Sequence, residues 1–159
     1  MNLSKLAWAT VFDEAAIGLA IVDADGRFVR VNSALAQILG TAPMEIVRTR
    51  VVEYAHPDEL ASDLVLLERL ASGALRSTEQ AKRLVRRDGR VVHAVARVKA
   101  IEGQKDEPPT FLWQILDVSE QGRLAQALAE ARQRLELFSS VGPAVIYCSR
   151  ASGDFGATY

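Results

Sequence analysis

Cysteine is almost absent from this sequence of 159 residues, since Cys148 is the only one. A single thiol excludes an internal disulfide framework and any metal site built from several thiolates. Because disulfides belong to oxidising compartments, the composition indicates a reducing cytoplasm as the cellular location.

Long apolar runs are missing as well. The longest, over residues 15–22, is far shorter than the roughly 20 residues that a membrane helix needs. The N-terminal stretch also lacks the apolar core of a signal peptide. We therefore expect no membrane contact within this segment, although a parent protein could carry its membrane spans elsewhere.

Neither sign of charge dominates. The chain has 19 basic and 20 acidic side chains, for a net charge of -1. Nucleic-acid binding relies on clustered positive charge that displaces counterions from phosphates, and a polybasic membrane anchor needs a similar cluster. The balance therefore predicts no nucleic-acid partner and no such anchor.

The motifs that usually carry catalysis are not found. The sequence has no Gly-rich phosphate loop, no nucleophile elbow and no carboxylate pair with a supporting partner. We therefore expect no enzymatic activity from this segment, and we expect any output activity to lie in a domain outside it.

What the sequence does contain is a series of short elements typical of one α+β domain. Asp25-Gly26 and Asp88-Gly89 lie between apolar runs and predict two hairpin turns. Strands are expected over 17–23, 27–31, 77–87, 90–101 and 111–116. Helices are expected over 33–39, 44–47 and 60–70. Strands on both sides of a helical block predict an antiparallel sheet with helices across one face.

The flanking segments predict four parts in all. A short amphipathic helix over 1–11 precedes the domain at 12–119. Residues 120–138 follow, with apolar side chains spaced alternately four and three apart, as in a coiled-coil seam: Leu124, Leu128, Ala131, Leu135 and Phe138. An amphipathic helix packed on its own domain is the alternative. Residues 139–159 weakly repeat the start of the domain and predict a linker leading into a truncated second copy.

A set of motifs falls in a characteristic order along the chain. They are Phe12–Gly18, Asp25–Asn32, Leu39-Gly40, His56–Glu59, Arg86–Val92 and Asp117–Glu120. Together they resemble the PAS family in its sensory-box form over residues 12 to 120. The resemblance implies a five-stranded antiparallel sheet, a small pocket under the helices, and modules that pair and pass signals along flanking helices. It also implies a parent such as a histidine kinase of a two-component system, a diguanylate cyclase or a transcription regulator.

The two histidines and the cysteine bear on the cofactor. His56, beside two carboxylates, could be a metal ligand or a general base, but the resemblance favours a helix start. Haem needs a ligand that faces the pocket, whereas His93 should point away from it by strand alternation. A photochemical flavin domain of the LOV kind needs a cysteine in the helical block, which Cys148 is not. By the same resemblance, Ile115 stands at the position where the LOV subfamily carries a glutamine that contacts the flavin ring. These residues argue against haem and covalently bound flavin, and leave the cofactor unknown.

The candidate ligand pocket is assigned to apolar side chains expected on the sheet face under the helices. They are Leu19, Ile21, Ala94, Ala96, Phe111, Trp113 and Ile115. Trp113 could stack on a cofactor or be core, and Asn32 could contact a ligand or, as we favour, cap a helix. Asp117 and Ser119 are expected to relay changes in the pocket to the following helix.

Three functions are compatible with these features. The first is a sensor that binds a small apolar ligand and signals through the C-terminal helix. The second is a ligand-free dimerisation and spacer module with a filled core, and the third is a small enzyme, which has the least support. The opposite sheet face carries Val95, Leu112 and Leu116 and needs cover, so we expect a homodimer through that face and the flanking helices.

Overall fold

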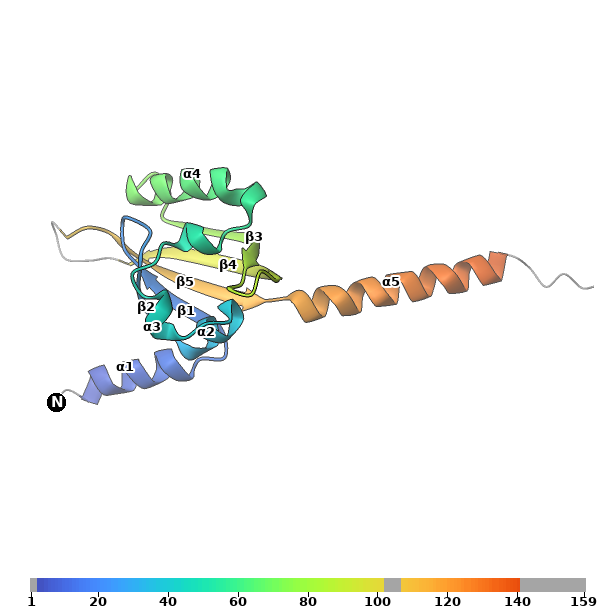
Figure 1. Cartoon of the computed structure of the whole chain (residues 1–159), viewed down its shortest axis with the longest axis horizontal. Helices are drawn as coiled ribbons and strands as arrows, with labels where there is room; N and C mark the ends of the chain where they lie inside the picture. The colour runs from blue at the N-terminus through green and yellow to red at the C-terminus, as the bar shows by residue number, and fades with distance from the viewer. Residues whose placement is uncertain (1–2, 102–106, 141–159) are drawn as a thin grey trace, which may run out of the picture. The chain divides into compact units, whose positions relative to one another are not determined.

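The computed structural model describes residues 3–101 and 107–140 (Figure 1). It confirms the α+β class, with a five-stranded antiparallel sheet in the order β2-β1-β5-β4-β3. The strands are β1 Gly18–Val22, β2 Phe28–Val31, β3 Ser77–Val85, β4 Val91–Ile101 and β5 Thr110–Asp117. The helices are α1 Leu3–Glu14, α2 Ser33–Leu39, α3 Pro43–Ile46, α4 Leu60–Ala71 and α5 Ser119–Ser140. Short 3₁₀ turns, η1 at Val51–Tyr54 and η2 at Pro57–Glu59, lead into α4.

The Asp-Gly turns form as their sequences predict. Before β2, the Asp23 carboxylate accepts hydrogen bonds from the backbone N–H groups of Asp25 and Arg27, at 3.0 and 2.9 Å. Gly26 follows with a φ of 76° and Gly89 closes the second hairpin at 83°, values that favour glycine. Both hairpins therefore bring predicted strand pairs together through local chemistry alone.

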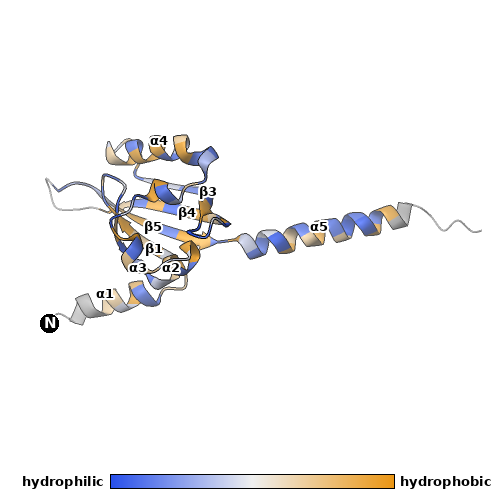
Figure 2. Ribbon diagram, viewed as in Figure 1, coloured by the Kyte–Doolittle hydropathy of each residue, from blue (hydrophilic) through white to orange (hydrophobic). Residues whose placement is uncertain are grey.

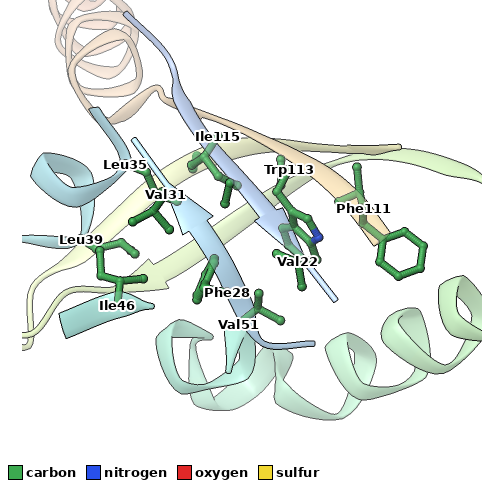
Figure 3. Packing of buried hydrophobic residues seen from close by; sticks show 14 of the residues in the cluster. Val22, Phe28, Val31, Leu35, Leu39, Ile46, Val51, Phe111, Trp113 and Ile115 are labelled. Atoms are coloured by element: carbon green, nitrogen blue, oxygen red, sulfur yellow. The ribbon is translucent and has the colours of Figure 1, made fainter. Parts of the chain in front are cut away.

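The buried cluster lies on one face of the sheet, which we call the inner face. It combines the alternate residues of β1, β4 and β5 with side chains from α2, α3 and α4 (Figure 3). On α4 only Leu67 and Leu70 are buried, whereas Leu60 and Leu64 are 40% and 44% exposed. The spacing of these four leucines places them on one face of the helix, but only the second half of α4 contributes to the core.

The end of α1 is fastened to the edge of the sheet. Phe12 is 3% exposed, and its ring stacks on Trp8 with centroids 5.1 Å apart. The Arg30 guanidinium of β2 lies 4.8 Å from the Phe12 ring centroid and bonds Asp13 at 3.0 Å. With these contacts α1 continues to Glu14, whereas the sequence pattern predicted the end of the N-terminal helix at residue 11.

The chain divides into two compact units, Met1–Arg123 and Leu124–Tyr159. In the second, Leu124, Leu128 and Leu135 are 64%, 55% and 69% exposed, and Figure 2 shows hydrophobic residues interspersed among hydrophilic ones along α5. Among the residues described, no helix is both long and apolar enough to cross a bilayer. Of the predicted linker and second copy at 139–159, residues 139 and 140 form the end of α5. Residues 141–159, including Cys148, lie outside the described residues.

Candidate ligand and relay site

Five of the seven predicted pocket residues lie together on the inner face. Their exposed fractions are 1% for Ala94, Ala96 and Phe111, 4% for Ile115 and 9% for Trp113. Strand pairing sets Ala96 opposite Ile115, and it sets Trp113 between Ala20 of β1 and Val98 of β4. Cross-strand partners share a face, so these side chains form one continuous apolar surface (Figure 3).

Leu19 and Ile21 do not belong to that surface. They pair with Gln114 and Leu112 on the opposite, outer face and are half-buried, whereas Ala20 and Val22 are fully buried on the inner face. The residues of β1 are apolar on both faces of the strand, so the sequence pattern cannot show which of them face the core. Pairing with β5 decides which residues face inward, and Ala20 and Val22 take the predicted places.

Two open hollows flank α4. One, of about 460 Å³, lies between Leu64 and Leu67 of α4 and the side chains of Arg27 and Arg50. The other, of about 550 Å³, lies at the far end of the helix and is lined by residues that include Leu70 and Ala100. None of the five inner-face candidates lines either of these two hollows, and because each is at most 9% exposed, the candidate surface is covered by packed side chains.

Ion pairs hold the N-terminal end of α4 to β3. Lys82, only 7% exposed on the inner side of β3, contacts the Asp63 carboxylate of α4. Burial lowers the pKa of the Lys82 ammonium, and the negative charge of Glu59 acts in the opposite direction. Glu59 also accepts from the Arg83 guanidinium at 2.8 Å and from its backbone N–H at 3.1 Å. Burial opposes ionisation of Glu59, but the bonds from Arg83 outweigh it and hold the pKa of that carboxyl below its usual range.

His56 is a structural residue of this junction. Its Nδ1 accepts a hydrogen bond from the Asp58 backbone N–H at 3.2 Å and so caps η2. That is the helix start the sequence favoured over a metal ligand. His93 is exposed, on the opposite side of β4 from Ala94, as strand alternation predicted.

The predicted relay residues lie where β5 passes into α5. The Asp117 carboxylate accepts from the Ser119 backbone N–H at 2.8 Å. The Ser119 hydroxyl accepts from the His93 backbone N–H at 3.0 Å and donates to the His93 carbonyl at 3.4 Å. That carbonyl also accepts from the Val118 N–H at 2.8 Å. The first residues of α5 follow β5 in the sequence, but their hydrogen bonds connect them to the neighbouring strand β4.

Asn32 does more than the predicted capping. Its side-chain oxygen accepts from the N–H groups of Leu35 and Leu19, both at 2.9 Å, and its amide donates to the carbonyls of Phe12 and Ile17, both at 3.0 Å. At 1% exposure it joins the end of α1 to β1 and α2. The sequence signals the cap through Asn-Ser, but the other three bonds depend on residues 13 to 20 positions away.

Trp113 carries a buried polar atom without a partner. Its Nε1 has no hydrogen-bond acceptor within the described parts of the chain. An indole N–H buried in this way loses its bond to water without replacement, which costs free energy. The strand pattern predicted the ring in the core but could not show where its N–H would lie.

Comparisons with known proteins agree with this geometry. A protein-family model described as PAS fold matches residues 7–118. The probable diguanylate cyclase DgcE of Escherichia coli (strain K12) is 30% identical over 139 residues, which are 87% of this chain and 13% of that protein. The sensor histidine kinase TmoS of Ectopseudomonas mendocina is 24% identical over 136 residues, 85% of this chain and 14% of that protein.

A solved structure shows the same fold. The PAS domain of the HTR-like protein from Haloarcula marismortui superposes with a TM-score of 0.61 at 18% identity, covering 72% of this chain and 91% of that one. At that identity the likeness concerns the fold alone. The chain spans a small part of the curated relatives, so their activities belong to proteins much longer than this one.

Proposed function

The chain belongs to the PAS fold family, and from that premise we propose that it receives a signal at the inner face and relays it through α5 to an output domain outside this chain. Support for the relay comes from the bonds that tie Ser119 to His93. The two relatives described above are signalling proteins by name, which favours a cyclase or a histidine kinase as the output domain. We expect no catalysis from this segment itself. We place the segment in the cytoplasm, in keeping with its single cysteine.

The relay follows from the connectivity of β5. Ile115 packs in the core and Asp117 lies two residues later, immediately before the bonds that start α5. Ile115 belongs to the same buried cluster as Leu67 and Leu70 of α4, so we expect a ligand that opens this cluster to change the packing around Ile115 and to move β4 and β5 relative to each other. Because Ser119 is bonded to β4 but follows β5, such a movement strains the start of α5. A ligand produces this only if it binds the two arrangements with different affinities.

The Ser119 hydroxyl provides the first test. We expect Ser119→Ala to speed amide hydrogen exchange at His93 about fivefold, since one net hydrogen bond of roughly 1 kcal/mol is lost. Ser119→Thr retains the hydroxyl and should keep the wild-type rate. The measurement is residue-resolved exchange by NMR, with the buried residue Val22 of β1 as reference. Equal exchange at His93 in the wild type and in Ser119→Ala would show that the tie does not restrain α5.

A second function is favoured by the packing of the inner face. Its candidates are buried by neighbouring side chains, as expected of a ligand-free dimerisation and spacer module with a filled core. Such a module acts by pairing, and the exposed leucines of α5 provide a seam for it. The same seam would serve a homodimeric sensor.

Self-association through α5 has a simple test. We expect the wild-type chain to sediment as a dimer at high concentration, and Leu128→Glu to sediment as a monomer, because a carboxylate in the seam cannot be buried without a partner. Gln133→Glu adds the same charge outside the predicted seam and should remain dimeric. A monomeric wild type would exclude the spacer function, whereas equal behaviour of the two variants would place the interface elsewhere.

A further inference from the structure

The unpartnered indole N–H of Trp113 has a consequence for the ligand. Almost all buried N–H groups in native proteins have an acceptor, so an exception calls for an explanation such as a bound molecule. One other buried nitrogen in the described residues is also unpaired, Nε of Arg86, but it lies 3.6 Å from the Asp88 carboxylate near the surface. For Trp113 Nε1 no ion pair or hydrogen bond is found among residues 3–101 and 107–140, and the ring lies on the surface assigned to the ligand.

The surroundings of Trp113 limit the chemistry of the ligand. Its ring lies between Ala20 and Val98 among apolar side chains, and Figure 3 draws the indole nitrogen on the side of the ring toward Phe111. The inner side of β3 carries one buried cation, Lys82, and Asp63 already neutralises it. A charged ligand would therefore lose its hydration without gaining a counterion.

We propose that the inner face takes a neutral, mostly apolar molecule with a single hydrogen-bond acceptor of the ketone or ester kind, and that this acceptor receives the Trp113 Nε1–H. The inference rests on the proposed ligand site and adds the class of ligand. An apolar body fits a surface made of Ala94, Ala96 and Ile115. One acceptor on the ligand satisfies the Trp113 N–H. Because this N–H has no hydrogen bond in the described structure, no existing bond has to be broken when the ligand binds.

Entry follows from the way α4 is held. Leu67 and Leu70 are its two buried side chains and belong to the same cluster as Trp113. Hollows flank the helix on two sides. A small ligand can reach the inner face by displacing these two leucines while the ion pairs keep the N-terminal end of α4 on β3. Affinity is then reduced by the free energy of opening, so we expect weak binding of small probes.

A matched pair of probes tests the class of ligand. Acetophenone carries one carbonyl acceptor, and ethylbenzene has the same ring and a similar shape without it. The chain has two tryptophans, so a two-dimensional ¹H–¹⁵N spectrum contains two indole signals, which Trp113→Phe assigns. We expect acetophenone to move the Trp113 signal downfield and to bind about tenfold more tightly than ethylbenzene, the factor that one hydrogen bond to an unpaired donor supplies. The signal of Trp8, which is 51% exposed, should not move.

Several outcomes would overturn the proposal. They are equal affinity for the two probes, an unmoved Trp113 signal when acetophenone is saturating, the absence of binding, and a water cross-peak to the Trp113 N–H in the probe-free protein. The probe comparison uses the wild-type chain, so it holds even if Trp113→Phe fails to fold. Failure of the relay is read separately: the indole signal would respond to acetophenone while exchange at the start of α5 stayed unchanged.

Discussion

Replacing Asn32 with alanine is expected to lower the free energy of unfolding by about 3 kcal/mol, one of the two largest effects of a single substitution in this chain. The side chain makes four hydrogen bonds to backbone groups of Phe12, Ile17, Leu19 and Leu35 at 1% exposure. Alanine leaves two carbonyls and two N–H groups without these partners. The measurement is the urea midpoint at constant slope.

Two comparisons sharpen this result. Ser33→Ala changes the neighbouring exposed residue in the first turn of α2 and should alter stability by less than about 0.5 kcal/mol. Asn32→Asp keeps both acceptor bonds but places a carboxylate against the carbonyls of Phe12 and Ile17, so it should not restore the loss. If Asn32→Ala were as mild as Ser33→Ala, Asn32 would not join α1 to the domain.

Replacing Asp63 with asparagine should cost a similar amount, roughly 3 kcal/mol, because it leaves the Lys82 ammonium buried without its carboxylate. The side chains of Lys82 and Asp63 are 6% and 15% exposed. The double variant Asp63→Leu/Lys82→Met removes both charges and should be close to the wild type or more stable, since an apolar pair needs no compensation. Chemical denaturation of the single and double variants provides the cycle.

An exposed ion pair that also involves β3 serves as control. Glu79 and Arg97 bridge β3 and β4 with side chains 52% and 64% exposed. Glu79→Gln should therefore cost less than about 1 kcal/mol. A cost for Asp63→Asn no larger than that for Glu79→Gln would show that α4 is not anchored to β3 by a buried pair.

Local chemistry accounts for what the sequence could predict. Hairpin turns and a helix cap depend on neighbouring residues, so Gly26 and Gly89 adopt the positive φ that their Asp-Gly motifs predict and Asn32 caps α2. In β5 the polar residue Gln114 marks the outer face, so the alternate residues are expected to face inward. Phe111, Trp113 and Ile115 are buried as expected.

The missed features depend on partners distant in sequence. The face of β1 is set by its pairing with β5, which an apolar run such as Gly18–Val22 does not encode. The packing of α4 depends on the position of the sheet beneath it, so the spacing of its leucines could not show that Leu60 and Leu64 stay exposed. The partnership of Lys82 and Asp63 likewise joins two elements across 19 positions.

A change in the core should reach the start of α5 through the hydrogen bonds between Ser119 and His93. Ile115→Val removes one buried methylene from the inner face without touching the junction. Amide hydrogen exchange at residues 119–123 should be measured in the wild type, Ile115→Val, Ser119→Ala and the double variant. We expect Ile115→Val to alter this exchange when the Ser119 hydroxyl is present and to have little effect when it is absent. The same change in both backgrounds, or none in either, would contradict the relay.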